Sequence, residues 1–272
     1  MLFPISYSIS VPQVFNWHLG SSGFTVEKGK ASGVEYSIMH NPSHTFNVAL
    51  YKEAINKGVV FMESRFGKGS VDKQLQLVEI HRWQDDRYNF INTIALSEKE
   101  GWVANTEGLQ EQAYIYQTVG SGLAKLWLQK NLTIANVQGA DMFILGLPEA
   151  LSLQFVKENL GEEAVALLIK KKIDKYAKDK NNEPNVEPPP IYADGTDYME
   201  ENKGAIALNQ LQEILGKEKF NKILLDFIRK APEQPKVFMD LYQKLLREVP
   251  VSEREAIVRL LETAERIELI KK

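Results

Sequence analysis

The pattern of apolar residues changes near residue 108, and this change limits the folds open to the chain. Before it, short runs rich in Val, Ile, Tyr and Phe are bounded by Gly, Pro or Asn, which is typical of β-strands. After it, apolar residues recur at helical spacing almost to the end. The β-rich front and the helical rear predict an α+β fold. Strands are predicted at Ile5–Val11, Phe24–Glu27, Val34–Met39, Leu75–Ile80 and Phe90–Leu96.

One helix is predicted inside the β-rich part, from Ser43 or Asn47 to near Gly67. Prolines between Lys180 and Asp197 predict a surface loop. Ser252 and Glu255 have the spacing of a capping box at a helix start. The later helices are predicted at Leu109–Leu128, Met142–Asn159, Glu162–Lys178, Gly204–Leu215, Lys217–Arg229, Pro235–Val249 and Ser252–Ala264.

Composition excludes several classes of function. The chain has 272 residues and no cysteine, so disulfides, thiolate metal sites and cysteine nucleophiles are excluded. The net charge of -3 gives no support for a nucleic-acid partner. The best apolar run, Ala140–Val156, is too short to span a membrane and is interrupted by Asp141, Pro148 and Glu149.

Residues Tyr116–Phe155 resemble the zinc-binding core of the alanyl-aminopeptidase family of gluzincins. In that family a helix carries the HExxH motif followed closely by Trp, and a linking turn leads to a second helix with a zinc-ligand Glu. The link Ala135–Ala140 is similar to that of a bacterial subgroup whose peptidase domain is fused to an ABC-type transporter permease.

Shorter matches extend the resemblance over roughly residues 20 to 265. His40–His44 with Phe46–Val48 resembles the start of the family's first helix, and Asn202–Ala205 resembles the segment after its catalytic Tyr. Asn92, Thr93 and Ile94 resemble the strand that borders the substrate. The resemblance implies a gluzincin (thermolysin-like) domain over 21–265, with a small mixed sheet before the helical half. Residues 1–20 would end a preceding β domain or form linking strands, and 266–272 would be the exit segment.

The resemblance also shows which catalytic groups are missing. Aligning Trp127 with the family's Trp puts the HExxH motif on Ser121–Lys125, the second-helix Glu on Leu145 and the catalytic Tyr on Glu201. A hydrolytic gluzincin needs two imidazoles one turn apart, a carboxylate ligand and a carboxylate base. Ser121 is a poor ligand, Gly122 offers no base, and Lys125 places an ammonium where a divalent cation should lie. Zinc is therefore predicted to be absent, and no catalytic residue is assigned.

The predicted vestigial cleft consists of Ser121, Gly122, Lys125, Leu145, Glu149 and Glu201. A Lys on a buried helix requires a carboxylate partner. Glu149 lies four residues after Leu145, on the same helix face, and Glu201 replaces the Tyr. We therefore expect the Lys125 ammonium to lie at the former zinc position and to meet Glu149, Glu201 or both, directly or through one water.

The remaining ionisable residues have ordinary interpretations. His40 and His44 have metal-ligand spacing, but Pro42 breaks any helix between them, and a solvated loop is favoured over a metal site. Glu79 and His81 share a strand face, where a surface pair is favoured over an acid–base pair. The basic run from Lys170 to Lys178 is interpreted as a solvated helix face, with contact to acidic lipid as the minor alternative.

Three functions remain open at this stage. The favoured one is an inactive aminopeptidase-like module that binds a peptide or protein, or serves as a structural domain of a larger ABC-type permease protein. Such a chain would be a soluble domain of a membrane-associated protein, and its opening within a strand suggests a fragment. The alternatives are an active metallo-aminopeptidase with an atypical metal site, and a generic domain whose likeness to the family is accidental.

Overall fold

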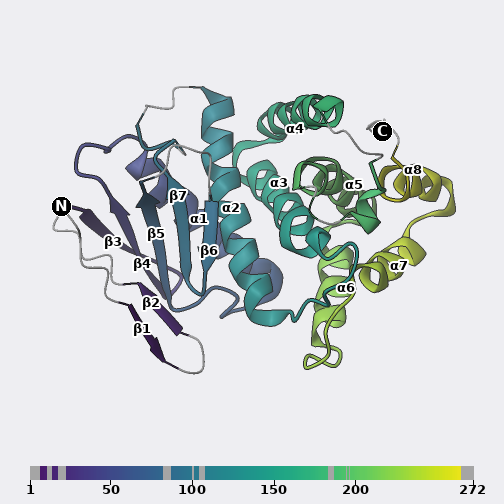
Figure 1. The fold of residues 1–272 in the computed structure, drawn as a ribbon, viewed down its shortest axis with the longest axis horizontal. Helices are drawn as coiled ribbons and strands as arrows, with labels where there is room; N and C mark the ends of the chain where they lie inside the picture. Colours follow the sequence, from purple (N-terminus) through teal and green to yellow (C-terminus); the bar gives the residue numbers. More distant parts are fainter. Residues whose placement is uncertain are drawn as a thin grey trace.

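The computed structural model describes residues 7–10, 14–17, 23–81, 87–99, 101–103, 108–182, 187–193, 195 and 197–264. The predicted α+β class is confirmed: a five-stranded mixed sheet in the N-terminal part precedes a helical half. One helix lies between two strands of this sheet in the sequence. Figure 1 shows the sheet on one side of the molecule and α3 to α8 on the other. The strands are β1 (Tyr7–Ser10), β2 (Val14–Trp17), β3 (Thr25–Ala31), β4 (Val34–His40), β5 (Gln74–Ile80), β6 (Arg87–Phe90) and β7 (Thr93–Ser97).

The five-stranded sheet has the order β3-β4-β5-β7-β6, and β1 and β2 form a separate antiparallel pair. The three inner strands, β4, β5 and β7, are mutually parallel, whereas the outer strands β3 and β6 are antiparallel to their neighbours. Parallel neighbours require a crossover, and α1 (Val48–Phe66) supplies it between β4 and β5. The carboxyl ends of the three parallel strands therefore lie together at one end of the sheet.

The prediction of one strand over Phe90–Leu96 is wrong. The segment contains the end of β6 and most of β7, which pair as a hairpin in which Phe90 lies opposite Thr93. Ile91 makes the turn with a φ of 45°, a conformation that β-branched residues rarely adopt. Because propensity favours extended backbone at Ile91, the sequence gives no sign of this reversal.

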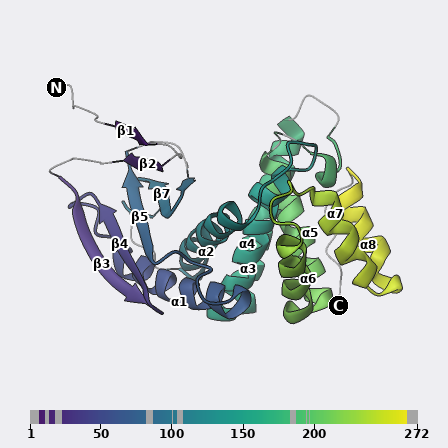
Figure 2. The same ribbon diagram turned by 90° about the horizontal axis from the view of Figure 1, so that it is seen from below.

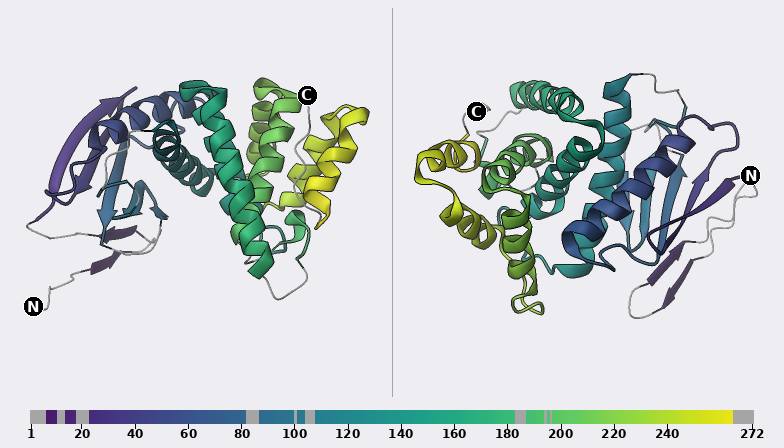
Figure 3. Two further views of the ribbon diagram at one scale, coloured as in Figure 1. Left: turned by 90° about the horizontal axis from the view of Figure 1, so that it is seen from above. Right: turned by 180° about the vertical axis from the view of Figure 1, so that it is seen from behind.

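The helices match their predicted positions closely. Asn47 and Gly67 flank α1 as its caps, and both have positive φ. In Figure 2, α1 and α2 lie between the sheet and the other helices. The view from behind in Figure 3 shows α1 crossing the sheet. The later α-helices are α2 (Leu109–Asn131), α3 (Leu147–Leu160), α4 (Glu162–Asn182), α5 (Ala205–Leu215), α6 (Lys217–Arg229), α7 (Phe238–Glu248) and α8 (Val251–Glu262).

Two predictions at helix ends are wrong. The capping box at Ser252 is absent, because α8 already begins at Val251, after Pro250, and no side chain caps it. The proline-rich segment is not entirely a surface loop, because α4 continues to Asn182 and a short 3-10 helix at Pro190–Tyr192 buries Ile191 in the main core. Within the ranges described above, no helix has both the length and the hydropathy needed to cross a membrane.

Wide helical turns precede α3 and α5. The π-helical segments η1 (Met142–Gly146) and η3 (Met199–Gly204) lead into these helices. They contact each other, and a Cβ added to Gly204 would meet the sulfur of Met142 at 2.6 Å. Such π-turns occur frequently at functional sites. Here they contain Leu145 and Glu201, two positions that the sequence assigns to the vestigial cleft.

Candidate functional site

The two helices that would hold a zinc ion pack side by side, as predicted. Gly120 on α2 allows this approach, since a Cβ there would meet the Phe155 ring of α3 at 2.7 Å. Trp127 lies in the core and stacks on Phe66 with ring centroids 3.9 Å apart. The close packing brings the Ser121 hydroxyl to 2.7 Å from Glu149, to which it donates a hydrogen bond.

Glu149, one of the residues predicted to form the vestigial cleft, is buried and has several polar partners. Its side chain is 1% exposed, and Gln117 donates a second hydrogen bond to it at 2.6 Å. Lys172 of α4 donates to the same carboxylate at 2.8 Å, and the Arg87 guanidinium lies 3.7 Å away. Burial alone raises the pKa of Glu149, but Lys172, Arg87 and Lys125 outweigh it and lower the pKa well below the ordinary value. Glu149 is therefore ionised and fully paired.

The predicted direct contact of Lys125 with Glu149 or Glu201 is wrong. Lys125 is half-buried, and in the part of the chain that the structure describes no carboxylate lies within ion-pair distance of it. Its charge still lowers the pKa of Glu149, and a contact through one water stays a prediction. Lys172 pairs with Glu149 instead, and its ammonium also donates to the Glu201 carbonyl at 2.8 Å.

The basic run on α4 is therefore not uniformly solvated, contrary to the prediction. Lys172 is 8% exposed, whereas Lys170, Lys171 and Lys175 are exposed. The sequence contained a signal for this difference. Lys172 lies four residues after Leu168 and four before Tyr176, so it belongs to the apolar face of the helix.

The other predicted cleft residues offer little room for a substrate. A Cβ added to Gly122 would meet Ile94 at 2.7 Å, so the position of the missing base is filled by the sheet. Leu145 is half-buried in η1. The Glu201 carboxylate lies 3.8 Å from the exposed Lys175. A cavity beside Asn92 has a volume of about 10 Å³, enough for one water.

The strand that was predicted to border a substrate is not at the edge of the sheet. Asn92 lies in the hairpin turn, and Thr93 and Ile94 belong to β7, which pairs with β5 on one side and β6 on the other. The edge on this side is β6. An extended peptide could therefore add to β6 but not to β7.

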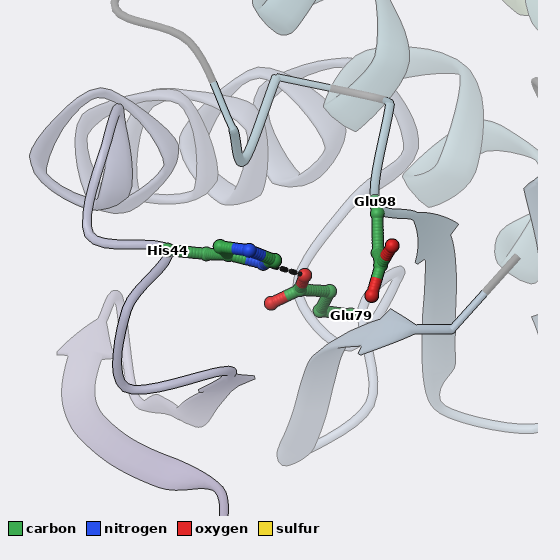
Figure 4. Close-up of side chains that lie close together, drawn as sticks. All are labelled: His44, Glu79 and Glu98. Atoms are coloured by element: carbon green, nitrogen blue, oxygen red, sulfur yellow. Dashed lines mark hydrogen bonds and ion pairs between the residues drawn. The ribbon is translucent and has the colours of Figure 1, made fainter. Parts of the chain in front are cut away.

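A second cluster of ionisable residues lies at the carboxyl ends of the parallel strands. Figure 4 shows His44 and Glu98 converging on Glu79, each from a different segment. His44 Nδ1 lies 2.5 Å from one Glu79 oxygen, and the Asn41 N–H donates to the other at 2.7 Å. His81 Nδ1 lies 2.5 Å from Glu98.

This cluster corrects two interpretations based on sequence. Glu79 is 2% exposed and pairs with His44 rather than His81, so the predicted surface pair of Glu79 and His81 is wrong. His40 is 1% exposed, stacks on Trp102 and donates from Nδ1 to the Asn41 carbonyl, so the predicted solvated loop is wrong for His40, whereas Pro42 and Ser43 are exposed. The burial follows from tertiary packing, which local sequence does not reveal.

No protein-family model matches this chain, and no curated protein shows significant sequence similarity to it.

Proposed function

We propose that this chain is a catalytically inactive relative of the gluzincin aminopeptidases. It acts as a binding or structural module, as part of a larger protein of the ABC-type permease class. The membrane connection rests on the sequence resemblance at Ala135–Ala140.

The observation that carries this proposal is the charge pattern around Glu149. A catalytic zinc site presents neutral imidazoles and carboxylates to a cation. Here the surroundings are cationic: Lys172 and Arg87 pair with the buried Glu149 carboxylate, and Lys125 adds a third positive charge nearby. A divalent ion would be repelled, and the Glu149 oxygens already have protein donors.

The ion pair of Lys172 with Glu149 also supports a structural role for the vestigial cleft. Lys172 joins α4 to α3 through Glu149 and to η3 through the Glu201 carbonyl. A buried pair of this kind fixes the relative positions of the elements it connects, while its removal from one side is costly. A peptide ligand would add to the edge strand β6.

Hydrolysis of aminoacyl-anilide substrates tests the proposal. We expect no hydrolysis above background, with or without added Zn²⁺, because neither a base nor an oxyanion donor replaces the missing residues. Chelator-sensitive hydrolysis that disappears in Glu149→Gln would contradict the proposal and favour an atypical metallo-aminopeptidase. The matched control is Glu255→Gln, which makes the same change at an exposed position of α8.

A further inference from the structure

The carboxyl ends of three parallel strands bring metal-ligating side chains together, outside the helical cleft. Glu79 is near the end of β5, Glu98 directly follows β7, and His44 lies in the segment between β4 and α1. Ligands of open α/β sheets bind preferentially at the carboxyl ends of the strands. One ligand atom from each of the three residues lies within 4.8 Å of the other two.

The cluster and its outer partner hold two carboxylates and two imidazoles. Glu79 and Glu98 are two carboxylates held close together, with side chains 2% and 14% exposed. Their ion-pair partners within the described ranges are imidazoles, His44 and His81, and not Lys or Arg. Carboxylates this close repel each other in a partly buried site. A divalent cation between them would neutralise both charges.

The geometry leaves room for such an ion and for water. The cluster opens into a cleft of about 250 Å³ lined by Gly23, Phe24, Asn41, Glu79, His81 and Glu98. Ligand atoms around one zinc lie about 3.4 Å apart, as bonds of ~2.1 Å at tetrahedral angles require. Side-chain rotations that move the ligand atoms by roughly 1 Å would bring the three atoms to that spacing. A water from the cleft would complete the site.

We propose that His44, Glu79 and Glu98 bind a first-row divalent transition-metal cation. An imidazole with two carboxylates suits Zn²⁺ or Mn²⁺, whereas Mg²⁺ and Ca²⁺ prefer all-oxygen ligands. His81 contacts Glu98 and orients it, as carboxylate ligands are oriented by outer partners. The sequence predicted no zinc anywhere in the chain; a metal at His44, Glu79 and Glu98 would overturn that prediction and leave it standing only for the helical cleft.

Titration calorimetry of the metal-free chain with Zn²⁺ tests the assignment. We expect one ion per chain, with weaker binding of Mg²⁺. His44→Ala and Glu98→Gln should each weaken Zn²⁺ binding by at least about tenfold, because each removes a ligand. His81→Ala should weaken it less. Co²⁺ provides a second readout, since its visible absorption reports imidazole and carboxylate coordination and should be lost in His44→Ala.

The controls separate this proposal from the proposed function. Glu255→Gln, at an exposed position of α8, should bind Zn²⁺ like the parent chain. Zinc affinity that is unchanged in His44→Ala and Glu98→Gln, or no binding at all, would overturn the metal site and leave the inactive-peptidase proposal standing. Zinc binding lost in Glu201→Gln but kept in Glu98→Gln would place the ion in the helical cleft and overturn both. Far-UV circular dichroism of each variant shows that the fold is retained.

Discussion

The Lys172 ammonium lies 2.8 Å from the Glu149 carboxylate and 2.8 Å from the Glu201 carbonyl. A single positive charge from α4 thus connects α3 to η3.

Lys172→Met should destabilise the chain by about 3–5 kcal/mol, because it leaves the buried Glu149 carboxylate without its nearest cation. Lys125→Met is the matched control. Lys125 is half-buried and has no ion-pair partner within the described ranges, so its loss should cost under ~1 kcal/mol. Urea unfolding of both variants measures the difference. A larger effect at Lys125 than at Lys172 would show that the assignment of the central ammonium is wrong.

The coupling between Lys172 and Glu149 can be measured separately. Glu149→Gln removes the charge that Lys172 neutralises, so the double variant should be more stable than the sum of the two single effects predicts. A mutant cycle in urea should give a coupling energy of roughly 1–3 kcal/mol. Additive single effects would indicate that the pair contributes nothing beyond packing.

The pKa of Glu149 predicts a loss of stability in acid. The folded pKa lies below the ordinary value of 4.5, so the carboxylate contributes stability that is fully present above pH 4.5. That contribution falls as the pH drops from 4.5 toward the folded pKa, by about 1.4 kcal/mol for each pH unit in that interval. Unfolding curves between neutral and acidic pH should show a smaller decline for Glu149→Gln than for the parent chain. Parallel declines would contradict the expected protonation.

Gly122→Ala should destabilise the chain by about 1–3 kcal/mol through overpacking against Ile94. The nearest atom to the added Cβ would be Ile94 Cδ1, which Val lacks. Ile94→Val should therefore recover part of the loss when combined with Gly122→Ala, although it destabilises the parent chain on its own. Thermal unfolding of the two single variants and the double variant tests this. No recovery of stability would mean that Ala at this position destabilises α2 for another reason.

The same contact limits any attempt to rebuild the enzyme site. In the combined change Ser121→His, Gly122→Glu, Lys125→His and Leu145→Glu, the new Glu at position 122 would be forced against Ile94 of β7. We expect this variant to lose cooperative unfolding, monitored by circular dichroism, rather than to gain hydrolytic activity.

Local patterns in the sequence determined the fold class and most element positions. Helix α1 ends where Gly67 provides a positive φ, and α2 and α3 follow the 3.6-residue spacing of apolar side chains. These features depend on near neighbours in the chain, so sequence periodicity predicts them. The packing of Ser121 against Glu149 also agrees with the helix pair that the resemblance implies.

Tertiary structure decided which charged residues meet. Lys125 and Lys172 both lie on helices with apolar faces, and only the placement of α4 against α3 selects Lys172 as the partner of Glu149. His44, Glu79 and Glu98 are far apart in the sequence and meet because β5 and β7 are parallel neighbours. Strand order depends on long-range pairing, whose free energy is distributed over the whole sheet. No short segment therefore contains the information that brings these side chains together.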